Sequence, residues 1–164
     1  MSQPDAPIAP PDVVRAVARG VSRLVAGQLT PSEREAELDA LAALYAEQTD
    51  VRHPFAPLGD EPMRSRAELR EHFANAGELT SGAERFEPVG TIVHQTQDPE
   101  VVVAEFAYDG SAGGRDFTIP CIFVVRVRDG QIDESRDYGD HLGLARAFGR
   151  LDGLVEAMLA AARD

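Results

Sequence analysis

The first half of the chain places apolar side chains at intervals of three and four residues, which is the spacing of amphipathic helices. The first such stripe predicts a helix over residues 12–27. A second helix is predicted over residues 30–49, because Thr-Pro-Ser-Glu at its start combines a capping residue, a first-turn proline and a glutamate. A short extended segment over 50–55 and a third helix over 65–77 follow.

In the second half, apolar and polar side chains alternate with the period of two that is typical of strands. The strands are predicted at 86–95, 101–109, 117–128 and 131–138, and a final helix at 142–162. That helix should break at Gly149 or Gly153. Tight turns, such as the one predicted at Asp109-Gly110 and the glycines at 113 and 114, make neighbouring strands antiparallel. With helices grouped ahead of the strands, the pattern predicts an α+β fold.

Two of these strands carry most of the information about a site. The strand over 117–128 is apolar on both faces in its middle, so we expect it to be central and covered on both sides. Pro120 within it predicts a bend that would curl the sheet into a half-cone. The next strand places Asp133, Ser135 and Asp137 at alternate positions. Such a strand either lies at a solvated edge or lines a polar cavity.

Composition narrows the classes of partner. The 164 residues suffice for one domain, which we expect over residues 12–164 behind a disordered, proline-rich tail of residues 1–11. A net charge of −12 argues against nucleic acid and membrane surfaces as partners. A single cysteine, Cys121, excludes an internal disulfide, and the N-terminus lacks the pattern of a secretory signal. We therefore expect a cytoplasmic protein.

Several motifs resemble one known superfamily. They are DVRHP at residues 50–54, RAEL at 66–69, and the hairpin FVVRVRDGQI at 123–132, which leads into RDYGD at 136–140. Over residues 32–140 the chain resembles the SnoaL-like branch of the nuclear transport factor 2-like superfamily. This superfamily also holds ketosteroid isomerases and limonene epoxide hydrolase-like enzymes.

The resemblance implies a curved antiparallel sheet wrapped by helices into a cone, a cystatin-like α+β roll, with the helices at 12–27 and 142–162 as additions. It makes a homodimer through the outer face of the sheet the expected assembly. It also implies that Asp137 acts as an acid or base, because a residue at this position often does so in the enzymes of the superfamily. Phe106 and Tyr108 stand where the epoxide hydrolase-like members carry charged residues, which disfavours epoxide hydrolysis.

Three residues are predicted to carry catalysis, each with a plainer alternative. Asp137 could exchange a proton if an apolar pocket raises its pKa; otherwise it would pair with an arginine such as Arg136. His53 has an ordinary pKa suited to proton transfer near neutral pH, or is a structural histidine at the pocket edge. Tyr108 could donate a hydrogen bond to a substrate oxygen, or be a half-buried aromatic residue with a wet hydroxyl.

Seven further residues are predicted to form the wall that binds the substrate: Tyr45, Phe73, Phe106, Ile119, Cys121, Phe123 and Ser135. For two of these residues a plainer role is open. Tyr45 could be a core residue on a helical stripe, and Cys121 could be a small buried apolar residue. His72 is expected on the surface. The four histidines lack the spacing of metal ligands, so we expect no metal and no cofactor.

Two functions from different classes agree with these observations. The first is a cofactor-independent enzyme that moves a proton on an apolar carbonyl or polyketide-like substrate, in an isomerisation or an aldol-type cyclisation. Asp137 would move the proton, and His53 or Tyr108 would stabilise the enolate oxygen. The second is a non-catalytic module that binds a ligand in the same cone, which the missing charged residues favour.

Overall fold

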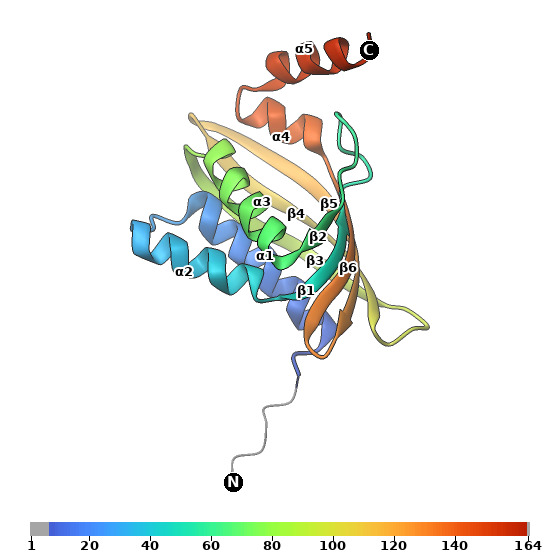
Figure 1. Cartoon of the computed structure of the whole chain (residues 1–164). Coiled ribbons are helices and arrows are strands. Elements are labelled where there is room, and N and C mark those ends of the chain that lie inside the picture. The colour runs from blue at the N-terminus through green and yellow to red at the C-terminus, as the bar shows by residue number, and fades with distance from the viewer. Residues whose placement is uncertain (1–6, 164) are drawn as a thin grey trace.

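The computed structural model describes residues 7–163. Helices and a single sheet follow one another along this part of the chain (Figure 1). The elements are α1 (Pro10–Ala26), α2 (Pro31–Ala42), β1 (Tyr45–Arg52), β2 (Met63–Ser65), α3 (Arg66–Leu79), β3 (Ala83–Gln95), β4 (Val101–Ala112), β5 (Arg115–Arg128), β6 (Gln131–Gly139), α4 (His141–Ala147) and α5 (Leu151–Ala161). The predicted tail lies mostly outside the described residues, and α1 already begins at Pro10.

The strands form one six-stranded sheet in the order β2-β1-β6-β5-β4-β3. The sheet is curved; α1 and α3 pack on its inner face, and α2 packs on both of these helices (Figure 1). The predicted α+β fold is therefore confirmed. All neighbouring strands are antiparallel except β1 and β6, which run parallel. The sequence gives no signal for this pair, because no tight turn joins strands so far apart in the chain.

Local signals fix the starts of the helices better than their ends. In α2, the Thr30 hydroxyl accepts a hydrogen bond from the Glu33 backbone N–H, and the Glu33 carboxylate accepts one from the Thr30 N–H in return. The predicted continuation to residue 49 is wrong, since α2 ends at Ala42 and Tyr45 begins β1.

In α3, Gly77 does not end the helix, which continues to Leu79. A side chain there would meet the Arg34 guanidinium, so this glycine allows α2 and α3 to approach closely.

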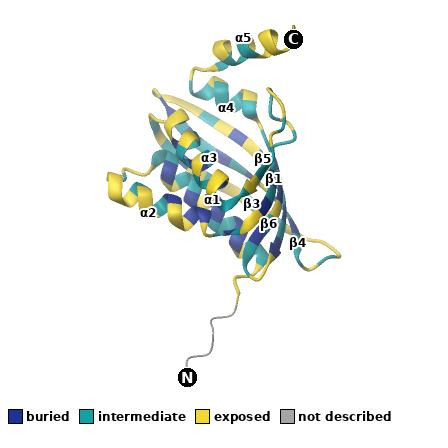
Figure 2. Ribbon diagram, in the orientation of Figure 1, coloured by how far each residue is buried: buried dark blue, intermediate teal, exposed yellow. Residues whose placement is uncertain are grey.

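The hydrophobic core lies between the helices and the inner face of the sheet (Figure 2). Val13, Val17 and Leu24 of α1 are buried there, where α1 packs on β3, β4 and β5. Within residues 7–163 no helix covers the outer face, and Ile122 of β5 is 43% exposed on it. The prediction that both faces of this strand are covered is therefore wrong for a single copy of the chain, because every helix packed on the sheet lies on one side.

The C-terminal segment breaks where a break was expected. Gly149 adopts a positive φ of 66° between α4 and α5, a conformation that glycine takes without steric cost. α4 packs on β5 over the open end of the sheet, and α5 continues away from the body (Figure 1). No residue of α5 is buried. Within residues 7–163, no helix is long and apolar enough to cross a membrane.

Candidate active site

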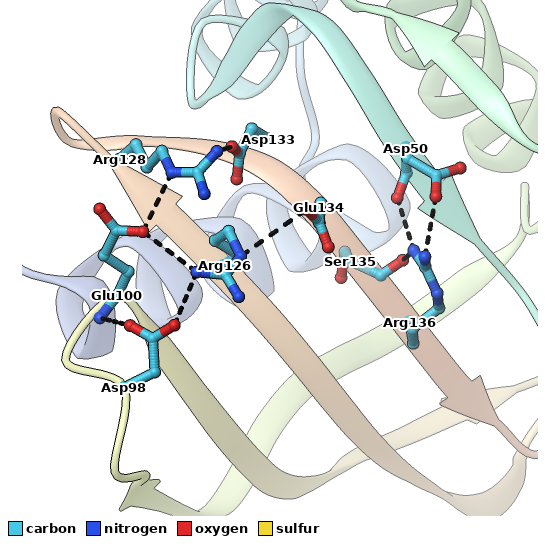
Figure 3. Close-up of polar contacts among 9 residues, drawn as sticks. All are labelled: Asp50, Asp98, Glu100, Arg126, Arg128, Asp133, Glu134, Ser135 and Arg136. Carbon is cyan, nitrogen blue, oxygen red and sulfur yellow. Dashed lines mark hydrogen bonds and ion pairs between the residues drawn. The ribbon is translucent and has the colours of Figure 1, made fainter.

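Asp137 lies on β6 with its side chain on the inner face of the sheet, and only 8% of the residue is exposed. The adjacent Arg136 points to the outer face, because neighbouring residues of a strand alternate. Its guanidinium bonds the Asp50 carboxylate there at 2.8 Å (Figure 3). The alternative in which Asp137 pairs with Arg136 is therefore not realised.

The acidic stripe of β6 is interrupted by an irregularity in its pairing with β5. Register shifts between the pairs Arg126–Glu134 and Val127–Ile132, so Asp133 is left outside the alternation. Asp133 accepts a hydrogen bond from Arg128 at 2.7 Å instead of facing the interior (Figure 3). The idea that Asp133, Ser135 and Asp137 share one face is wrong for Asp133 and right for the other two.

Asp137 faces a cavity of about 150 Å³ between the inner face of the sheet and helices α1, α3 and α4. All three residues predicted to be catalytic line it: Asp137, His53 and Tyr108. Three of the seven predicted wall residues also line it, namely Ile119, Cys121 and Phe123. Apolar residues from α1, α3 and α4, which the sequence did not mark, complete the wall.

The other four predicted wall residues lie in the layer around the cavity. Tyr45 and Phe73 are buried against each other with ring centres 5.8 Å apart. Phe106 packs edge-on between Tyr108 and Phe123, at 5.2 and 5.0 Å between ring centres. Ser135 is buried, and its hydroxyl donates a short hydrogen bond to Asp137. These residues hold the cavity wall in place and do not form its surface.

Burial dominates the electrostatics of Asp137. Loss of solvation disfavours its charged form and raises the pKa from 3.8 to about 7, while the Ser135 hydrogen bond opposes this rise. Both protonation states are therefore populated near neutral pH, which is the property required of a general acid or base.

His53 lies beside this carboxyl group, and two further histidines lie beside His53. His53 Nε2 lies 3.9 Å from Asp137 Oδ2, and the His53 ring is 5.1 Å from His72 and 5.7 Å from His141. Burial and the two neighbouring rings lower the pKa of His53 to about 4. At neutral pH His53 is thus a neutral imidazole and does not form an ion pair with Asp137.

Two of these histidines were not assigned to the site from the sequence. His72, expected on the surface, contacts His53 and is partly buried, and burial lowers its pKa. Its position, three residues after Leu69 on α3, was an available signal, since this spacing puts both on one helix face. His141 lines the cavity, and its Nε2 is buried without a hydrogen-bond partner among the described residues. No sequence pattern marked it.

Tyr108 offers an unused polar group to the same cavity. Its hydroxyl is buried and has no hydrogen-bond partner within the described chain, while its ring stacks on Phe86 with 4.4 Å between centres. Burial raises the pKa of Tyr108 well above 10, so the phenol stays protonated and can donate. Burial also raises the pKa of Cys121 to about 12, which keeps it a thiol. Among residues 7–163, no three His, Cys, Asp or Glu side chains are placed to hold a metal ion.

The sequence profile of the SnoaL-like domain matches residues 30–135. The chain belongs to this SnoaL-like family. No curated protein sequence matches it. The matched segment ends two residues before Asp137, so the profile covers most of the sheet but not α4 and α5.

Solved structures agree with this assignment at the level of fold. A candidate isomerase from Bacillus subtilis has 22% identity and a TM-score of 0.61, over 84% of this chain and 96% of that chain. A candidate polyketide cyclase from Xanthomonas campestris pv. campestris has 18% identity and a TM-score of 0.60, over 84% and 94%. A Catenulispora acidiphila protein with a ketosteroid isomerase-like fold has 19% identity and a TM-score of 0.59, over 85% and 93%. At these identities the likeness shows the shared SnoaL-like fold alone.

Proposed function

We propose that this SnoaL-like protein is a cofactor-independent enzyme that moves a proton on a small, largely apolar carbonyl compound. The reaction would be an isomerisation or an aldol-type cyclisation. The observation that carries the proposal is the Asp137 carboxyl group, which faces a mainly apolar cavity and whose pKa burial raises to about 7. The structural likeness to a candidate isomerase and a candidate polyketide cyclase supports the same class of chemistry.

In the first step, ionised Asp137 removes a proton from the carbon beside the substrate carbonyl. The C–H bond breaks, an O–H bond forms on Asp137, and the electron pair moves onto the carbonyl oxygen. The Tyr108 hydroxyl, which has no hydrogen-bond partner among residues 7–163, or the N–H of neutral His53 donates a hydrogen bond to that oxygen.

The second step distinguishes the two reactions. In an isomerisation, Asp137 returns its proton to a different carbon. In a cyclisation, the nucleophilic carbon attacks a second carbonyl of the same molecule, and the new alkoxide takes the proton from Asp137. Either way the carboxyl group ends the cycle ionised.

Replacing Asp137 by Asn tests the role of this residue, because the amide keeps the shape and cannot accept the proton. We expect the D137N variant to lose at least about 100-fold in turnover of candidate ketones, the usual contribution of a positioned acid or base. The D133N variant is the matched control, since Asp133 bonds Arg128 away from the cavity and should leave turnover unchanged. A folded D137N variant with normal turnover would remove Asp137 from the mechanism.

The second candidate is a binding module that holds a ligand in the same cavity without converting it. It is favoured by Phe106 and Tyr108, which place one apolar ring and one phenol where, by the resemblance, the epoxide hydrolase-like enzymes carry charged residues. Mass spectrometry after incubation with a metabolite extract separates the two candidates. Retention of one unchanged compound supports the module, whereas any conversion excludes it.

We also propose a homodimer through the outer face of the sheet. Val89, Ile92 and Ile122 are exposed there by 40%, 57% and 43%, and a second copy would cover them. Sedimentation of the wild type and of an Ile122→Glu variant tests this. A dimer that the variant converts to a monomer supports the proposal, and a monomeric wild type contradicts it. Val155→Glu on the exposed side of α5 is the control.

A further inference from the structure

A second hollow lies next to the candidate active site and shares part of its wall. Its volume is about 350 Å³, and its walls come from the start of β5 and from α4. Ile119 and Asp140 line both hollows. Along α4, His141 and Leu144 face the first hollow, whereas Arg146 faces the second. The two spaces are therefore neighbours whose walls share Ile119 and Asp140.

Two arginines line this second hollow without a carboxylate partner. Arg115 of β5 and Arg146 of α4 take part in no ion pair within residues 7–163. Elsewhere on the same sheet, Arg126, Arg128 and Arg136 are all held by carboxylates (Figure 3). Two arginines that no carboxylate neutralises therefore line one hollow, in a chain of net charge −12.

The two acidic residues of the hollow are already engaged. Asp116 pairs with Arg85 at 3.3 Å. Asp140 accepts a hydrogen bond from the Gly143 backbone N–H at 2.7 Å. A side chain at position 143 would collide with this carboxylate, so Gly143 lets Asp140 stay bound to the backbone. Neither acid pairs with Arg115 or Arg146, and both guanidinium groups remain available to an anion from outside the chain.

From this arrangement we infer that the hollow beside α4 is a subsite for an anionic group of the substrate. This inference rests on the proposed function and adds the substrate class: an apolar oxo acid. Its carbonyl-bearing body would occupy the cavity at Asp137, and its carboxylate would lie between Arg115 and Arg146. Guanidinium groups match the planar geometry of a carboxylate, and such charge-assisted hydrogen bonds are stronger than neutral ones.

Two probes that differ only in charge test the inference, γ-benzoylbutyrate and its primary amide. Isothermal titration calorimetry on the full chain should give a Kd about tenfold lower for the carboxylate than for the amide. Added salt should reduce the difference, since both arginines are exposed to solvent. In a variant with both Arg115→Gln and Arg146→Gln, the preference should vanish while the Kd of the amide stays unchanged.

The Arg19→Gln variant is the matched control. Arg19 is an exposed residue of α1 that likewise takes part in no ion pair among the described residues, but it lines neither hollow. Its loss should leave the preference for the carboxylate intact. The inference is overturned if the wild type binds both probes with equal affinity. It is also overturned if the preference for the carboxylate survives the loss of both arginines. Either result leaves the proposal for the cavity at Asp137 standing. Binding of neither probe contradicts both.

Discussion

The negative charge of Asp137 destabilises the native state, because the fold buries this carboxyl group. Around this carboxyl group lie Tyr108, Cys121 and Phe123, and its ionised form has lost most of its solvation. A pKa raised from 3.8 to about 7 corresponds to roughly 4 kcal/mol of native-state stability lost when the group is charged. We interpret this cost as the price of a proton acceptor that works near neutral pH.

This cost predicts how the D137N variant should behave. Between pH 3.8 and about 7 the native state holds a proton that the unfolded state has released, so the stability of the wild type falls as pH rises through this window. The neutral amide does not titrate. At about pH 8.5 we expect D137N to be more stable than the wild type by about 2–4 kcal/mol, and the difference to shrink by about pH 4. Urea unfolding at several pH values measures it, and a difference independent of pH contradicts it.

Ser135 gives a second test at the residue scale. Its hydroxyl donates a hydrogen bond to Asp137 and lowers the pKa of that carboxyl group, in opposition to burial. The S135A variant should therefore raise the pKa of Asp137 further above its wild-type value. A carboxyl-carbon NMR titration of the variant checks this, and a pKa that moves toward 3.8 would contradict it.

At the scale of elements, Gly110 of β4 lies so close to neighbouring atoms that its replacement should destabilise the fold. A Cβ atom at Gly110 would lie 2.5 Å from both the Arg85 carbonyl oxygen and the Phe117 ring. The G110A variant should lose at least about 2 kcal/mol of unfolding free energy, because backbone and ring must both move. G153A in α5 is the control, since nothing lies within 4 Å and alanine favours a helix. Equal effects of the two changes on thermal unfolding would contradict this account.

Gly110 also shows why the sequence predicts some elements and not others. The turn was predicted from Asp109-Gly110 and the glycines at 113 and 114. Only Gly113 and Gly114, both at positive φ, belong to it, because β4 continues through Asp109-Gly110 to Ala112. The capping box of α2 and the alternation of β5 are local patterns, so both were predicted. The position of Gly110 against Phe117 depends on pairing between strands, which no local pattern records.

The same distinction between local patterns and distant contacts explains which parts of the site could be predicted from the sequence. Asp137, His53 and Tyr108 were each identified from the sequence, and all three line one cavity. The parts that failed depend on distant contacts. The irregular pairing of β6 turns Asp133 away from the interior, and the packing of α3 and α4 brings His72 and His141 to His53.

At the scale of the molecule, the C-terminal helices contribute unequally. α4 supplies His141 and Leu144 to the cavity, whereas α5 has no buried residue. Ending the chain after Arg150 should therefore lower the unfolding free energy by less than about 1 kcal/mol and leave one cooperative transition, as expected for the single domain proposed over residues 12–164. Ending it after Asp140 should cost more, because the cavity loses a wall. Similar losses in thermal unfolding for the two truncations would contradict this division.

All of the proposed chemistry depends on one group that protonates near neutral pH inside the fold. A carboxyl-carbon NMR titration of Asp137 in the wild-type protein, assigned by comparison with D137N, measures this directly. The structure predicts a midpoint at about pH 7. A midpoint close to 3.8, the ordinary value for an aspartate, would show that the carboxyl group is solvated and would contradict the account.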